Sequence, residues 1–169
     1  IFMKRRHIVL LGILAVLVLA ALIYTRPMPL QEIGKVDIAQ CESVSGYHRR
    51  APDSEFTSFE LSTDDARRSQ LIDLFAQQKF RRSLINLLSP DGGSTHRPKD
   101  GDFIWDLSFN FGPTDFPDGS TGKGTFIQCR DFYGTLSVSR VIDGKTLRCT
   151  TSEQEAFLQQ VYDIISAEP

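Results

Sequence analysis

The longest stretch without a charged residue lies near the N-terminus, between Ile8 and Tyr24. A helix rises about 1.5 Å per residue and the hydrocarbon core of a bilayer is about 30 Å thick, so this stretch lies at the short end of what spans a membrane. It has no polar face, which argues against a buried helix of a soluble domain. Three basic residues precede it, namely Lys4, Arg5 and Arg6. The sequence therefore predicts a cytoplasmic tip and a transmembrane signal-anchor over residues 1–26.

The same stretch has a second interpretation, as a secretory signal that is removed. Signal peptides have apolar cores of roughly 7–15 residues followed by a small-x-small cleavage site. Val18-Leu19-Ala20 would serve as such a site, but the run is longer than a typical signal core and ends in bulky side chains. We favour a retained anchor. Because basic residues before a span stay in the cytoplasm, both interpretations place the rest of the chain outside it.

The remaining chain is long enough for one domain with a hydrophobic core. Pro27 and Pro29 fix φ and oppose a helix, so residues 27–35 are predicted to be a linker and residues 36–169 the extracytoplasmic domain. From Pro27 onward, 15 Lys and Arg stand against 21 Asp and Glu, a formal charge of −6. This acidic balance argues against nucleic acid as a partner, since nucleic acid favours basic surfaces.

Two strands and a helix are predicted first in this domain. Alternating apolar residues predict strands over 36–47 and 55–63. A cap at Ser62 or Thr63, followed by apolar residues at three-and-four spacing, predicts a helix that runs to about Phe80. The basic cluster at its end is interpreted as a partner of the helix C-terminal dipole; it comprises Lys79, Arg81 and Arg82.

The strongest strand signal covers residues 103–111, where large apolar residues alternate with smaller or polar ones. This pattern predicts one face buried in the core and one face, including Asp106, in water. The residues expected to face the core are Phe103, Trp105, Leu107, Phe109 and Phe111.

Three more strands and a second helix complete the domain. The strands are predicted over 125–131, 134–141 and 145–151, with an Asp143-Gly144 hairpin turn between the last two. A capping box, Ser152 with Glu155 or Thr151 with Gln154, starts the final helix. Because strands follow one another without alternating helices, we expect an α+β fold. An antiparallel sheet of about five or six strands would pack against two helices.

This layout resembles small membrane-anchored or lipoprotein-like bacterial proteins that form a domain-of-unknown-function family. The resemblance covers the basic start and apolar span, "YTRPMPLQEI", the strand pair, "TDDARRSQLIDLFAQQKFRRS" and "GTLSVSRVIDGKTLRCTTSEQEAFLQQVYDII". It implies a location in the envelope of a bacterium, of the Gram-positive type. It carries over no site residues.

The three cysteines, Cys41, Cys129 and Cys149, are interpreted as small buried side chains. One disulfide and a catalytic thiol stay open as alternatives. In a simple meander Cys129 and Cys149 lie two strand spacings apart, about 10 Å, beyond the ~7 Å limit for bridging. Cys41 would reach Cys149 only if the first and last strands were neighbours.

No cluster in the sequence points to a metal, a cofactor or a catalytic centre, so no residue is assigned to one. The histidines His7, His48 and His96 lack metal-ligand spacing, although a Cys–His pair stays open. "GSTGKGT" lacks the spacing of a phosphate loop and leads into a strand. Two acidic loops without a calcium-binding pattern flank the 103–111 strand; their aspartates are Asp91, Asp100, Asp102, Asp115 and Asp118.

Two classes of function follow. The favoured one is a non-enzymatic binding or interaction module, tethered to the membrane as a single-pass protein, whose partner is another envelope protein or a cell-wall component. The alternative is a hydrolase of the cell envelope. Acid, base and nucleophile residues are dispersed along the sequence, which favours the module. A pocket that gathers carboxylates or His with shifted pKa values would favour the hydrolase instead.

Overall fold

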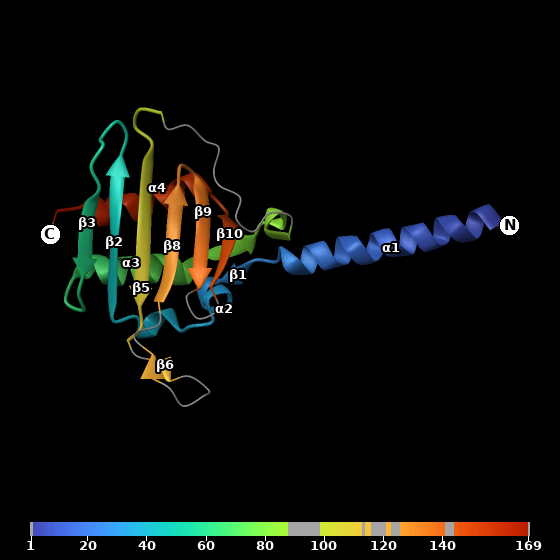
Figure 1. The fold of residues 1–169 in the computed structure, drawn as a ribbon, viewed down its shortest axis with the longest axis horizontal. Coiled ribbons are helices and arrows are strands. Elements are labelled where there is room, and N and C mark those ends of the chain that lie inside the picture. Colours follow the sequence, from blue (N-terminus) through green and yellow to red (C-terminus); the bar gives the residue numbers. More distant parts are fainter. Residues whose placement is uncertain are drawn as a thin grey trace.

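The computed structural model describes residues 2–87, 99–112, 114–115, 121–122, 126–140 and 144–168. Helix α1 (Phe2–Tyr24) projects from one edge of the folded domain (Figure 1). Its segment from His7 to Tyr24 is long and apolar enough to cross a membrane, and none of that segment is buried.

The centre of the domain is one antiparallel sheet of eight strands. Its order from the α1 side is β1 (Met28–Pro29), β4 (Lys79–Arg82), β10 (Lys145–Thr151), β9 (Thr135–Arg140), β8 (Phe126–Phe132), β5 (Phe103–Asn110), β2 (Ser43–Arg50) and β3 (Thr57–Leu61). A separate two-stranded ribbon pairs β6 (Thr114–Asp115) with β7 (Thr121–Gly122).

Helices α3 (Ala66–Gln77) and α4 (Gln154–Ser166) lie together on one face of the sheet (Figure 1). The shorter helices are α2 (Leu30–Gly34) and the 3₁₀ turns η1 (Ile38–Gln40) and η2 (Leu84–Leu87). The α+β class and the antiparallel sheet predicted from the sequence are confirmed, with a larger number of strands.

The core lies between the sheet and the two long helices, with Phe75 of α3 near its centre. Its ring packs against four other aromatic rings with centroids 5.0–6.3 Å away: Phe80, Trp105, Phe109 and Phe157. The core-facing residues predicted over 103–111 are confirmed, because Trp105, Leu107 and Phe109 are fully buried and Phe103 and Phe111 pack against the core. The opposite face was predicted to lie in water, but Ile104 and Asp106 on it are also buried.

Residues 27–35, predicted to be a linker, instead belong to the folded domain. Met28 pairs with Phe80 in the ladder between β1 and β4. Met28, Leu30 and Ile33 are buried in the core. The two prolines do oppose a long helix, but the apolar side chains around them gain more from burial than from exposure to water.

The predicted helix ends earlier than expected, at Gln77. It is capped by Asp65, whose side chain accepts from the Arg67 N–H at 2.9 Å. Residues 79–82 form β4 between β1 and β10, so the basic cluster lies on a strand and not at a helix terminus. Strand pairing on both sides outweighs the local helix pattern here, since Phe80 reaches the core from β4.

The first predicted strand is shifted along the chain. Residues 38–40 form η1, because the Asp37 side chain accepts from the Ala39 N–H at 3.1 Å and stabilises a local turn. Strand β2 begins at Ser43 and continues to Arg50, three residues beyond the predicted end of the strand at residue 47. Its full length pairs with β5.

Candidate functional site

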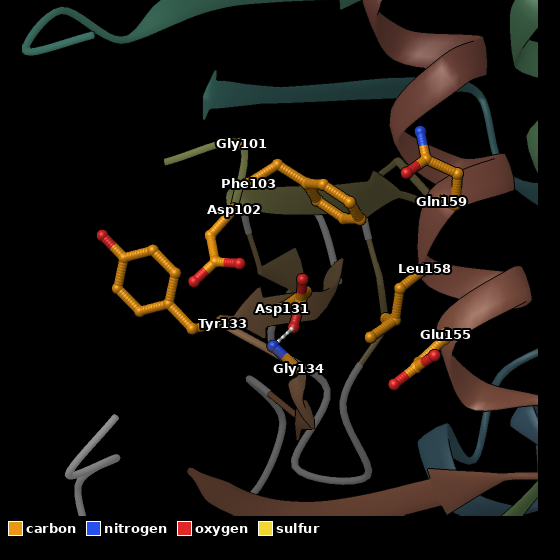
Figure 2. A pocket seen from close by; sticks show the side chains of 9 residues that line it. All are labelled: Gly101, Asp102, Phe103, Asp131, Tyr133, Gly134, Glu155, Leu158 and Gln159. Atoms are coloured by element: carbon orange, nitrogen blue, oxygen red, sulfur yellow. Dashed lines mark hydrogen bonds between the residues drawn. The ribbon is translucent and has the colours of Figure 1, made fainter. Parts of the chain in front are cut away.

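A pocket opens at one end of the sheet and has a volume of about 350 Å³. Three parts of the chain form it: the start of β5, the turn between β8 and β9, and the first turns of α4 (Figure 2). Its lining residues are Gly101, Asp102, Phe103, Asp131, Tyr133, Gly134, Glu155, Leu158 and Gln159.

Asp131 is the buried carboxylate of this pocket. It lies on the inward face of β8, is 1% exposed, and accepts a hydrogen bond from the Gly134 N–H at 2.8 Å. Tyr133 and Gly134 both adopt positive φ, 50° and 81°, which suits a two-residue hairpin turn. Burial raises the pKa of Asp131 to about 7; the charge of Asp102 adds to the rise and the Gly134 N–H opposes it.

Asp102 is held in place by the backbone around it. Its carbonyl accepts from the Ala51 N–H at 2.7 Å, and its carboxylate accepts from the Lys99 N–H at 2.8 Å. Figure 2 shows this carboxylate on the side of the pocket nearest Asp131. The two acidic groups therefore share one wall.

Helix α4 supplies the opposite wall. Glu155 lies in its first turn, where a negative charge is stabilised by the helix dipole. The Gln154 amide donates to the Gly134 carbonyl at 2.6 Å and accepts from the Thr151 N–H at 3.4 Å. The latter bond joins the two residues of the predicted Thr151–Gln154 capping box, but the N-cap of α4 is Glu153, so neither predicted box forms. Gln154 thus fixes the hairpin turn against the helix, which gives the pocket two linked walls.

The lining suits a ligand with a positive group and an apolar body. Three carboxylates line the pocket together with the rings of Phe103 and Tyr133 and the side chain of Leu158. Aromatic faces and carboxylates both attract ammonium and guanidinium groups. Among the described residues, no three His, Cys or acidic side chains gather closely enough to hold a metal ion. These acids are therefore not placed to share one metal ion, but all three border the same cavity.

The cysteines are free thiols in the core, as the favoured interpretation had it. Cys129 and Cys149 lie on β8 and β10 with β9 between them, and Cys41 precedes β2, which is not a neighbour of β10. Burial raises the pKa of all three thiols, to about 12 for Cys149. A thiol with a raised pKa is a poor nucleophile, which argues against the catalytic alternative.

Two other candidate residues that the structure describes, His48 and Asp100, do not line the pocket. The His48 ring packs between Phe59 and Tyr162, and burial lowers its pKa. Asp100 lies beside Gly101 at the pocket's edge but is not among its lining residues. Other candidates lie outside the residues, or the side chains, that the structure describes: His96, Asp91, Asp115 and Asp118.

The sequence pattern predicted that the Asp106 side chain lies in water, and this prediction is wrong. It is 2% exposed on the face of the sheet that α3 and α4 leave uncovered. Its carboxylate accepts from Tyr47 at 3.1 Å, from Gln128 at 2.9 Å and from Arg130 at 2.7 Å. Neighbouring strands bury this carboxylate under longer side chains, and the paired Arg130 offsets the cost of burying the charge.

The sequence analysis also missed Asp131 and Glu155. One signal was present for Asp131: it continues an inward series with Ile127 and Cys129, so the strand period places a carboxylate among core positions. No protein-family model, curated protein or solved structure matches this chain significantly.

Proposed function

We propose that this chain is a membrane-tethered, extracytoplasmic binding module of the bacterial envelope, and that it recognises a cationic group in the pocket at the end of the sheet. The observation that carries the proposal is the gathering of Asp102, Asp131 and Glu155 around one cavity. A pocket with a few convergent polar groups on an apolar lining is the usual form of a ligand site. The envelope location rests on the sequence resemblance.

The tether is supported by α1. This helix is unburied along its apolar length, and leaving so much apolar surface in water is unfavourable. The basic residues before the span outnumber the single Arg26 just after it. This asymmetry favours a cytoplasmic N-terminus and a domain on the outer side.

The ligand class follows from the pocket walls. A lysine-like ammonium or an arginine-like guanidinium group would lie between the acidic wall of β5 and β8 and Glu155 of α4. Its aliphatic portion would contact Phe103 and Leu158. Such groups occur on proteins and on cell-wall peptides, the two partner classes expected in the envelope.

N-acetyl-lysinamide tests this proposal, with N-acetyl-norleucinamide as the control that lacks the charge. Titration of the full chain in detergent, followed by NMR shifts of residues 131–134, should show saturable binding of the lysine compound only. Binding should tighten between pH 6 and pH 8, because a cation favours the ionised form of Asp131.

Two glutamates at the start of α4 provide a matched pair of variants. Glu155→Gln removes a carboxylate that lines the pocket, whereas Glu153→Gln removes one that does not. We expect about a fivefold to tenfold weaker binding for Glu155→Gln, the size of one partly exposed ion pair or charged hydrogen bond, and little change for Glu153→Gln. Equal binding of both lysinamide and norleucinamide would contradict the proposal.

A hydrolase of the envelope is the second candidate, and the raised pKa of Asp131 favours it. A carboxyl with a pKa of about 7 can donate or accept a proton near neutral pH. Against this role, Asp131 already accepts a hydrogen bond within its own hairpin. Release of products from cell-wall fragments by the wild type, lost in Asp131→Asn, would support the hydrolase over the module.

A further inference from the structure

The 3₁₀ turn η2 presents apolar side chains to solvent. Leu84, Ile85 and Leu87 are 46%, 41% and 63% exposed. Outside α1, the described residues include six large apolar side chains that are exposed, and half of them lie in this turn. Exposed apolar groups that cluster in this way mark a surface that contacts something other than water.

Hydrogen bonds hold the turn in this orientation. Its one polar side chain, Asn86, faces inward and pairs with both backbone groups of Arg148: it accepts from the N–H and donates to the carbonyl, each at 2.9 Å. The Ser83 N–H also donates to the Arg148 carbonyl at 2.9 Å. Because the polar residue is bound to β10, the apolar ones project outward.

The turn lies beside the end of α1. The Arg82 side chain donates from Nε to the Tyr24 carbonyl at 3.1 Å, and its guanidinium lies 4.4 Å from the centroid of the Tyr24 ring. Leu84 follows Arg82 by two residues, a distance of at most about 7 Å along the chain. Figure 1 shows the short yellow-green coil of η2 next to the point where α1 leaves the domain.

We infer that η2 enters the lipid interface next to α1 and holds the domain against the membrane surface. This inference rests on the membrane tether of the proposed function. A tyrosine at the end of a spanning helix marks the level of the headgroups, and η2 is fixed at that level through Arg82. Apolar side chains flanked by basic ones suit this position: Arg81 is exposed on the adjoining strand.

Site-directed fluorescence on the full chain tests the inference. The chain is reconstituted in vesicles of phosphatidylethanolamine and phosphatidylglycerol, with a polarity-sensitive probe on a single introduced cysteine. The native cysteines are buried and do not compete for the reagent. Leu87→Cys reports on η2 and Leu17→Cys on α1. Phe56→Cys is the matched control, since Phe56 is 49% exposed and lies next to β3 at the opposite edge of the sheet.

We expect the probe at position 87 to emit at shorter wavelength in vesicles and to lose most of its fluorescence to nitroxide-labelled lipids. The probe at 17 should be quenched as well, and the probe at 56 should not. Quenching at 17 without quenching at 87 would overturn the inference while leaving the tether intact. A blue shift at 87 that lipid nitroxides do not quench would indicate cover by protein, and would also overturn it. Absence of quenching at 17 would overturn the tether itself.

Discussion

Asp131 is a buried carboxyl group, so its ionisation acts against folding. Its pKa is raised from 3.8 to about 7, which means that the folded protein binds a proton between these values and the unfolded chain does not. The contribution of Asp131 to stability should therefore be most favourable below about pH 4, fall as the pH rises to about 7, and then level off. The full shift corresponds to a loss on the order of 4 kcal/mol.

Asp131→Asn should remove this pH dependence. The amide oxygen can still accept from the Gly134 N–H, while the group can no longer ionise. We expect the variant to be more stable than the wild type at pH 8 by a few kcal/mol and similar to it near pH 4, measured by denaturant unfolding at both values. Asp163→Asn, at an exposed position of α4, is the control and should show no such trend. A constant difference between wild type and Asp131→Asn at all pH values would refute the argument.

The three cysteines give a second prediction at the scale of residues. Their thiols are buried and their pKa values are raised, so the reactive thiolate is scarce in the folded protein. Mass spectrometry after treatment with iodoacetamide should detect no alkylated cysteine in the native chain and three in denaturant. Cys41 lies two residues before β2, and rapid alkylation of its thiol would contradict its burial.

At the scale of secondary-structure elements, the close pairing of strand β2 with strand β5 depends on Gly46. A Cβ placed on this residue would lie 1.9 Å from the Asp106 carbonyl oxygen, a backbone atom of the neighbouring strand. Gly46→Ala would therefore push the two strands apart and weaken their hydrogen bonds. We expect a loss of about 1–3 kcal/mol or more in unfolding free energy, compared with about 1 kcal/mol or less for Ser45→Ala on the same strand. Equal stability of the two variants would show that β2 moves away at no cost.

The elements differ in how well the sequence predicts them. Strand β5 and helix α4 each carry a complete apolar period within one segment, so local pattern is sufficient. Strands β1 and β4 have only two and four residues, too few for a local pattern. They form because neighbouring strands supply backbone partners: β4 pairs with both β1 and β10. The pocket could not be predicted from the sequence for a similar reason. Its acids come from three distant segments, and only the sheet order brings Asp102, Asp131 and Glu155 together.

At the scale of the whole molecule, α1 and the domain form a continuous structure. The Arg82 side chain binds the last carbonyl of α1, and β1 begins four residues after Tyr24. Only a few residues therefore separate α1 from the edge strand of the sheet. With α1 in a membrane, as proposed, this short connection would hold the domain near the bilayer, because the β3 edge is the one farthest from α1 (Figure 1).

The last prediction is that α1 remains part of the mature chain. Its apolar run exceeds a typical signal core, and Val18 is bulky for a small-x-small cleavage site. The mass of the protein extracted from membranes should therefore include residues 8–24. Val18→Ala creates Ala-Leu-Ala at positions 18–20 and serves as the positive control, because a signal peptidase that reaches this site should cleave it. We expect cleavage and release of the domain for the variant only. A wild-type chain that begins at Ala21 would mean that the helix is a cleaved signal. The released domain would then keep Tyr24 and its contact with Arg82.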